Sequence, residues 1–332
     1  MTAKKVEIGI HLSNRGWLVG NEPTPHVKST LLQMAQRIEE AGYHSVWVGD
    51  SVVAKPRFEA LTLLSAIAAR TERVKVGVTV LLPALRHPIH LAHQAATIDQ
   101  IADGRFILAV GAGGAGERGS SYQNEWDALG VPYKERGPRM DETIDILRKL
   151  WREDHVTHEG RFFRFRDVTL APKPMRPEGI PIWTVCGHGL RPLIPVQVRR
   201  VIERADGWMT AVAFPQDCRQ TRKRLESAAR EAGRDPKSIH SAITLRVNVN
   251  PDKERAREEF ETHLLEYYNH VKFWKEVDGH HIWGPYGSVE YVRERMEAYI
   301  EAGIQTFVVL FTAPHQMQQF EEFTEKVWPC FA

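Results

Sequence analysis

The stretch that decides the fold is "VTVLLPALRHPIHLAHQAATIDQIADGRFILAVGAG", residues Val78 to Gly113. It contains the end of a β-branched strand over Val74–Leu82, an amphipathic helix over Pro88–Ala102, and an apolar strand over Phe106–Val110. A helix between two strands favours parallel pairing through a crossover, because a hairpin needs only a short turn. The stretch therefore predicts one strand–helix–strand unit of an α/β sheet.

The same alternation continues on both sides of this unit. Further strands are expected at residues 6–12, 45–48, 181–189, 205–210, 239–249 and 304–311. Further helices are expected from Thr24-Pro25 to about Gly42 and at residues 58–70, 138–151, 191–204, 253–276 and 288–303. Eight strands separated by helices predict a closed (β/α)8 TIM barrel, with an open doubly wound sheet as the alternative if fewer strands form. The 332 residues fit one such domain, 1–332.

One segment interrupts this pattern. "EGRFFRFRDVTLAPKPMRPEGIP", residues 159–181, alternates arginine with phenylalanine and then becomes rich in proline. We interpret it as an inserted hairpin and loop whose aromatic face packs on the protein. A basic strand of this kind could also contact nucleic acid, but the overall charge argues against that reading.

Composition limits the class of partner. The chain has 44 basic and 42 acidic residues, a balance that favours small molecules over nucleic acids or membranes. No run approaches the roughly 20 apolar residues of a membrane helix, and no signal peptide is recognised. The three cysteines form no C-x-x-C pair, which is typical of reduced thiols. We expect a cytoplasmic protein.

Gly111, Gly113 and Gly116 satisfy the G-x-G-x-x-G spacing after a strand. They do not predict a dinucleotide-binding loop, because residues 117–138 have the composition of a loop and the next helix is expected only near Arg139. In a barrel, however, the loop after a strand lies on the face that binds ligands, and glycines there let backbone N–H groups approach a phosphate. A flexible lid without a ligand is the alternative.

Several motifs, taken in order, resemble the luciferase-like monooxygenase family of flavin- and deazaflavin-dependent enzymes. Besides residues 78–113, they are "EEAGYHSVWVGD" (39–50), "RMDETIDILRKLW" (139–151), "PKPMRPEGIPIW" (172–183), "RADGWM" (204–209) and "GSVEYVRERMEAYIEAGIQTFVV" (287–309). The resemblance covers nearly the whole chain. It implies a luciferase-like TIM barrel with inserted segments and a homodimer or higher homo-oligomer.

Within that family the chain is most similar to the branch that uses coenzyme F-420, an 8-hydroxy-5-deazaflavin. The resemblance implies that Asp50 lies near the deazaflavin ring and that Thr79-Val80 is a non-proline cis peptide behind it. It also implies two phosphate-binding loops, made of Gly111, Ala112, Gly113 and Gly114 and of Gly187, His188 and Gly189. From the residues alone, His11 at the end of the first strand is a candidate catalytic group, because imidazole titrates near neutral pH.

One departure limits the resemblance. Sugar-phosphate dehydrogenases of this branch carry a histidine after the second-strand aspartate and a glutamate in the fourth-strand loop, where this chain has Ser51 and Gly114. That activity is therefore not expected. The leading hypothesis is hydride transfer to or from a small organic substrate with coenzyme F-420.

Two other functions stay open from the sequence. One is a monooxygenase that uses reduced FMN supplied by a separate flavin reductase, and the other is a ligand-binding protein without catalysis. No metal site is expected, because the histidines lack ligand spacing. Trp17, Trp274 and Trp283 could form the wall of an apolar substrate pocket, or could belong to the core.

Overall fold

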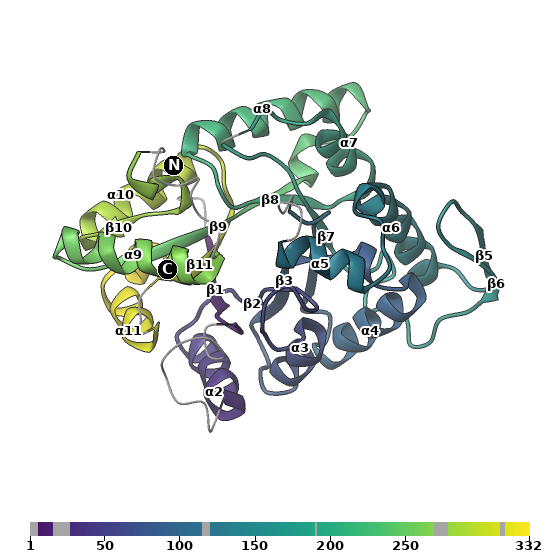
Figure 1. Cartoon of the computed structure of the whole chain (residues 1–332), viewed down its shortest axis with the longest axis horizontal. Coiled ribbons are helices and arrows are strands. Elements are labelled where there is room, and N and C mark those ends of the chain that lie inside the picture. Colours follow the sequence, from purple (N-terminus) through teal and green to yellow (C-terminus); the bar gives the residue numbers. More distant parts are fainter. Residues whose placement is uncertain (1–5, 16–26, 115–119, 190, 269–277, 313–315) are drawn as a thin grey trace.

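The computed structural model describes residues 6–15, 27–114, 120–189, 191–268, 278–312 and 316–332. Eight parallel strands pair in a ring, and both the β8–β9 and the β11–β1 pairings are present, so the sheet is closed (Figure 1). The predicted barrel is confirmed, and the open sheet is excluded. The strands, in ring order, are β1 (Glu7–Leu12), β2 (Ser45–Val48), β3 (Lys75–Leu81), β4 (Phe106–Val110), β7 (Ile182–Val185), β8 (Gly207–Thr210), β9 (His240–Val249) and β11 (Thr306–Phe311).

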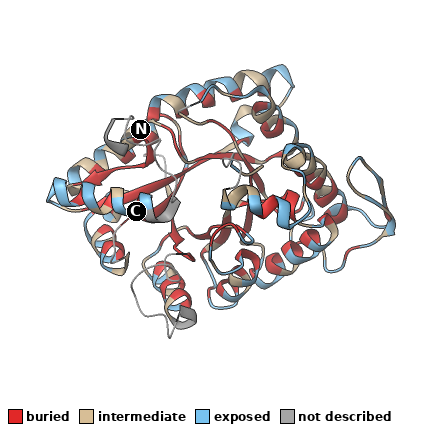
Figure 2. Cartoon of the chain, in the orientation of Figure 1, coloured by how far each residue is buried: buried red, intermediate tan, exposed pale blue. Residues whose placement is uncertain are grey.

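Helices surround this barrel and bury one face against it, with exposed residues on the outer face (Figure 2). The pattern follows from the amphipathic spacing of each helix, since an apolar stripe is stable only against another apolar surface. The surrounding helices are α2 (Val27–Glu40), α3 (Ala60–Ala68), α4 (Pro88–Ile101), α6 (Arg136–Arg152), α7 (Pro195–Arg204), α8 (Pro215–Glu231), α10 (Val289–Glu301) and α11 (Gln316–Lys326).

Three additions to the barrel lie near its loops. An antiparallel hairpin, β5 (Val156–Glu159) with β6 (Arg164–Val168), projects beyond α4 and α6 in Figure 1. It occupies the region where the sequence predicts an inserted hairpin, beginning three residues earlier than expected. The other additions are helix α9 (Lys253–Tyr268) with the short strand β10 (Tyr286–Gly287), and helix α5 (Ser121–Ala128).

Helix α5 corrects the expectation that residues 117–138 form only a loop. Ser120 caps the helix by accepting a hydrogen bond from Gln123 N at 3.3 Å, and Trp126 is buried. The tertiary burial of one tryptophan stabilises a helix that is too short and polar to be predicted by its periodicity.

Helix boundaries account for the other differences. α6 begins at Arg136, and α7 begins at Pro195 rather than Arg191, because proline is favoured in the first turn and unfavourable inside a helix. Helices α8 and α11 are not predicted from the sequence. The expected helix start at Thr24-Pro25 and the extension of the helix beyond Tyr268 lie outside the described residues.

Candidate active site

The middle of the barrel is filled, so a ligand must bind at its mouth. Side chains alternate along β9, which turns Ala242, Thr244 and Arg246 inward in successive layers toward the carboxyl end. Below Arg246, the rings of Trp47 and Trp183 lie with centroids 5.5 Å apart. A ligand site must lie above these rings, at the face where barrel enzymes bind ligands.

His11 enters this mouth from β1. It is the parallel partner of inward-facing Trp47, and it is 6% exposed. Its Nδ1 has no hydrogen-bond partner among the described residues. Burial, together with the positive charges of Arg57 and Arg246, lowers the pKa of His11 to about 3. The imidazole is therefore neutral at neutral pH and has a ring nitrogen available to a ligand.

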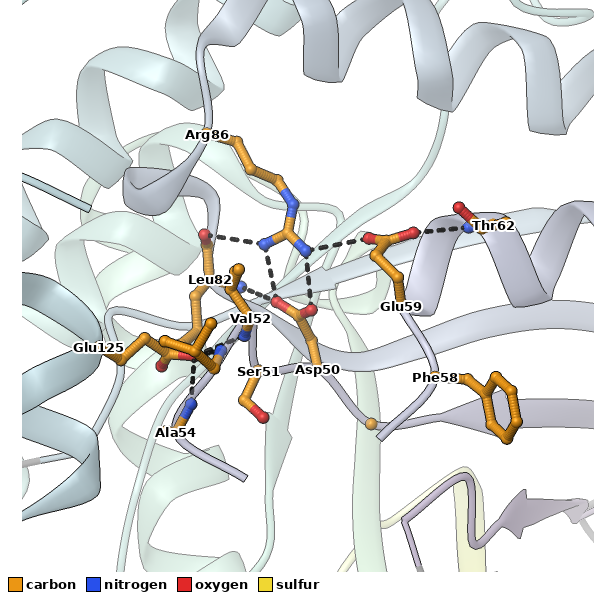
Figure 3. A network of polar contacts seen from close by, with 12 residues as sticks. Asp50, Ser51, Val52, Ala54, Phe58, Glu59, Thr62, Leu82, Arg86 and Glu125 are labelled. Carbon is orange, nitrogen blue, oxygen red and sulfur yellow. Dashed lines mark hydrogen bonds and ion pairs between the residues drawn. The ribbon is translucent and has the colours of Figure 1, made fainter. Parts of the chain in front are cut away.

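Asp50 lies at the end of β2, as the sequence predicts, and its carboxylate is held by the loop after β3 (Figure 3). Arg86 donates to Oδ1 and Oδ2 at 2.8 Å each, and Leu82 N donates to Oδ2 at 3.0 Å. The Asp50 side chain is 1% exposed, whereas Glu59, which also accepts from Arg86 at 3.1 Å, is 44% exposed. Asp50 thus connects the loops after β2 and β3.

A second carboxylate fixes the loop that follows Asp50. Glu125 on α5 is 1% exposed, and its Oε1 accepts hydrogen bonds from the backbone N–H groups of Val52, Val53 and Ala54 (Figure 3). Three donors on one oxygen are a strong anchor because the acceptor is charged. The loop after β2 is therefore held from both β3 and α5.

The end of β3 has the geometry that the family resemblance implies. The peptide bond Thr79-Val80 is cis, which confirms that prediction, and the register of β3 with β4 shifts between Val78 and Leu81. Thr79 Oγ1 lies 3.3 Å from Thr244 Oγ1 across the barrel interior. The irregular strand end forms one side of the mouth.

The glycine loop after β4 begins directly beside this bulge. A Cβ at Gly111 would lie 2.8 Å from Val80 Cγ2, so only glycine fits there. Gly113 has φ +84°, a conformation that disfavours side chains, and the space beside it is occupied by Trp126. Ala112 is half-buried, and the carbonyl of Gly114 accepts a hydrogen bond from Tyr133 at 2.8 Å. Backbone rather than side chains therefore lines this part of the mouth.

A second glycine loop follows the neighbouring strand β7. Gly187 has φ +83°, and Gly187, His188 and Gly189 line a cleft of about 580 Å³ together with the first turns of α8. Burial and the charge of Arg191 lower the pKa of His188, while Asp217 opposes this effect. The first turn of α8 carries Asp217, whose Oδ2 accepts from Phe214 N at 2.8 Å, so a phosphate here would bind the loop backbone rather than the helix terminus.

The catalytic and cofactor-binding residues proposed from the sequence lie on one arc of the barrel. The strands β1, β2, β3, β4 and β7 are consecutive neighbours in the ring, and they carry His11, Asp50, Thr79-Val80 and the two glycine loops at their carboxyl ends. The arc has a neutral imidazole at one end and glycine backbone at the other. It could hold an elongated ligand with a ring and a phosphate.

Sequence reasoning missed the charged residues around the arc. Arg86 and Glu125 bind groups far away in sequence, so no local pattern identifies them. Arg246 left a signal, because it is an arginine at a buried, inward position of strand β9. Its guanidinium lies 4.1 Å from the centre of the Trp283 ring. Trp17 and Trp274 lie outside the described residues.

Within the described ranges, no group of three or more His, Cys, Asp or Glu side chains is arranged to hold a metal ion. In the same part of the chain, no helix has the length and apolar character needed to span a bilayer.

Comparison with known proteins adds independent information. A family model described as luciferase-like monooxygenase matches residues 6–306. A curated relative, an F-420-dependent glucose-6-phosphate dehydrogenase of Segniliparus rotundus, is 30% identical over 243 residues, which cover 69% of this chain and 65% of that protein. The chain thus spans just under two thirds of that relative.

Two solved structures share the fold over nearly their full length. A monooxygenase from Streptomyces bottropensis superposes with a TM-score of 0.78 at 21% identity, covering 98% of this chain and 100% of that one. An F-420-dependent secondary alcohol dehydrogenase, in complex with an F-420–acetone adduct, superposes with a TM-score of 0.77 at 24% identity, covering 99% of both chains.

Proposed function

Because the chain belongs to the luciferase-like monooxygenase family, we propose that it is an oxidoreductase that binds coenzyme F-420 and transfers hydride to or from a small organic substrate. The observation that carries this proposal is the arc at the barrel mouth, where a bulged strand end adjoins two glycine loops. The names of its relatives support the choice of cofactor.

The residues present fit such a cofactor. Glycine lets the loop after β4 pack closely on Val80 and Trp126, and lets the loop after β7 pack on Thr221, so that backbone is left to meet a ligand. The N–H groups of Gly111 and Gly189 donate to the carbonyls of Leu81 and Val212, so the other backbone N–H groups of these loops would hold the cofactor phosphate. Thr79 and Val80 would support one face of its ring, which leaves the other face open toward the centre of the mouth.

When bound, the deazaflavin supplies a ring carbon that accepts or gives a hydride, the equivalent of one proton and two electrons. For an alcohol substrate, loss of that hydride from carbon and of a proton from oxygen leaves a carbonyl. His11 is neutral, so its Nδ1 can accept a hydrogen bond from the hydroxyl and orient it, while the proton leaves to water because a pKa of about 3 makes this imidazole too weak a base to keep it. Asp50 positions the loop after β3 through Arg86.

The substrate should differ from that of the glucose-6-phosphate dehydrogenases. Ser51 donates its hydroxyl to the carbonyl of Lys55 at 3.2 Å, and Gly114 carries no side chain. Neither residue can exchange a proton as the histidine and glutamate of those enzymes would. We therefore propose a different small organic substrate.

The proposal includes the oligomeric state and the location of the protein. The family resemblance supports a homodimer or higher homo-oligomer. The three unpaired cysteines, two of them buried, support a cytoplasmic location. If FMN were the cofactor instead, a separate reductase would be needed as a partner.

Binding titrations test the cofactor. Quenching of tryptophan fluorescence by coenzyme F-420 and by FMN should give dissociation constants in which the deazaflavin binds at least tenfold more tightly. Micromolar binding of FMN without binding of the deazaflavin would replace the proposal by the monooxygenase, and binding of neither would remove both.

A further inference from the structure

Basic side chains gather on the side of the mouth that the cofactor proposal leaves unused. Lys55 and Arg57 lie in the loop after β2, and Arg246 points inward from β9. Arg15, which follows β1, is 2% exposed. The charges of Arg15 and Arg57 both lower the pKa of Lys55, after burial, so these side chains are near neighbours.

Two of these cations have no carboxylate partner within the described ranges. Lys55 is 7% exposed, and its ammonium lies 5.6 Å from the ring centre of Tyr122 without an ion pair. Arg57 lies directly over Gly49, where an added side chain would collide with its guanidinium and come within 3.3 Å of His11 Nε2. Arg57 is half-buried, and lysine and arginine side chains removed from water are normally paired because an isolated charge there is costly.

The nearby carboxylates are committed elsewhere. Asp50 and Glu59 both bind Arg86, and Glu125 binds backbone N–H groups. Among the described residues, none of these three carboxylates pairs with Lys55 or Arg57. Positive charge at this side of the mouth is therefore left for a ligand to neutralise.

These cations lie on the side of the mouth where the substrate would bind, away from the loops proposed for the cofactor phosphate. In the ring of eight strands, β9 lies opposite β3, so Arg246 faces the Thr79-Val80 bulge across the mouth. The glycine loops lie after β4 and β7. A group held by Lys55, Arg57 and Arg246 would thus lie on the open face of a ring that rests on the bulge.

We infer that Lys55, Arg57 and Arg246 form a binding site for an anionic oxygen group of the substrate, a phosphate or a carboxylate. That the bound anion belongs to the substrate rests on the proposed function. That an anion binds here rests on the cation cluster alone. Arginine suits this role because its guanidinium can donate two parallel hydrogen bonds to such a group. Anion binding would also offset the positive field on His11.

Calorimetric titration with inorganic phosphate, and separately with acetate, tests the site in the protein without cofactor. Arg57→Met should weaken the binding of the favoured anion at least tenfold, and Arg57→Lys should retain part of it. Arg166→Met, on the exposed β5–β6 hairpin, serves as the matched control and should leave anion binding unchanged. Tighter binding of phosphate or of acetate distinguishes the two anion sources.

Repetition with coenzyme F-420 present separates this inference from the proposed function. The Arg57-dependent binding should persist when the cofactor occupies the glycine loops, and it should be measurable even if the cofactor does not bind. Lys55→Met provides a second variant in case Arg57→Met melts early. Equal anion affinity in wild type and in both folded variants, or no anion binding to the wild type, would overturn the inference.

Discussion

Substitution of Asp50 by alanine should destabilise the barrel mouth by a measurable amount. The change leaves the Arg86 guanidinium, 13% exposed, without its two bonds to Asp50. Removing one partner of a buried ion pair costs about 3 to 5 kcal/mol. Glu59 still binds Arg86, so we expect the lower end, about 3 kcal/mol.

The corresponding change in melting temperature follows from chain length. An unfolding entropy of about 2.1 cal/mol/K per residue gives about 0.7 kcal/mol/K for 332 residues. A loss of about 3 kcal/mol therefore lowers Tm by about 4 °C, and the variant remains folded at 25 °C. Its turnover should also fall, because the loop after β3 is no longer held.

Differential scanning calorimetry with two further variants provides the control. Glu59→Gln removes a half-exposed contact to the same guanidinium and should cost less than about 1 kcal/mol. The double variant Asp50→Ala, Arg86→Met should lose less free energy of unfolding than the two single variants lose together, because no unpaired cation remains buried. If Asp50→Ala melts with the wild type, the Asp50–Arg86 pair does not stabilise the mouth as reasoned here.

The other predictions concern the glycine loop and acid stability. Gly113→Val should lower Tm, because its side chain meets Trp126, and should also reduce cofactor affinity at least tenfold, whereas Gly130→Val, at a positive φ without neighbours, should lower Tm alone; equal affinities in fluorescence titration would contradict this. The pKa of His11 is lowered from 6.5 to about 3 in the folded protein, so below pH 6.5 the unfolded chain binds a proton that the folded protein does not. The free energy of unfolding therefore falls by about 1.4 kcal/mol per pH unit as the pH drops from 6.5 toward 3. Urea unfolding at pH 7 and 5.5 should show this loss, and His11→Gln should reduce it; an identical loss in that variant would refute the assignment. Burial raises the pKa of Glu7, but hydrogen bonding and the charge of His44 outweigh this and lower it to about 2. The free energy of unfolding should therefore fall further as the pH drops from 4.5 to 2. If Glu7→Gln shows the same fall, Glu7 is not its cause.

The barrel was predictable because its determinants are local in sequence. The strand–helix–strand unit at residues 78–113 has clear periodicity, and the same pattern recurs along the chain. The cis bond at Thr79-Val80 came from the family resemblance, since no local propensity predicts it. Helix α5 was missed because one buried side chain, Trp126, stabilises it through tertiary contacts.

The polar part of the site was only partly predictable. The positions of Asp50 and His11 follow from the rule that function lies at the carboxyl ends of barrel strands. The partner of Asp50 does not follow, because Arg86 reaches it from another loop. The approach of both Arg57 and Arg246 to His11 depends on barrel closure, which joins segments about 190 residues apart in the sequence.

The central claim is that the arc of bulge and glycine loops binds coenzyme F-420. The most direct test is fluorescence titration of the wild type and of Gly113→Val with this cofactor and with FMN. Our account predicts that the wild type binds coenzyme F-420 at least tenfold more tightly than FMN, and that Gly113→Val loses at least tenfold of that affinity. Absence of deazaflavin binding to the folded wild type would contradict it.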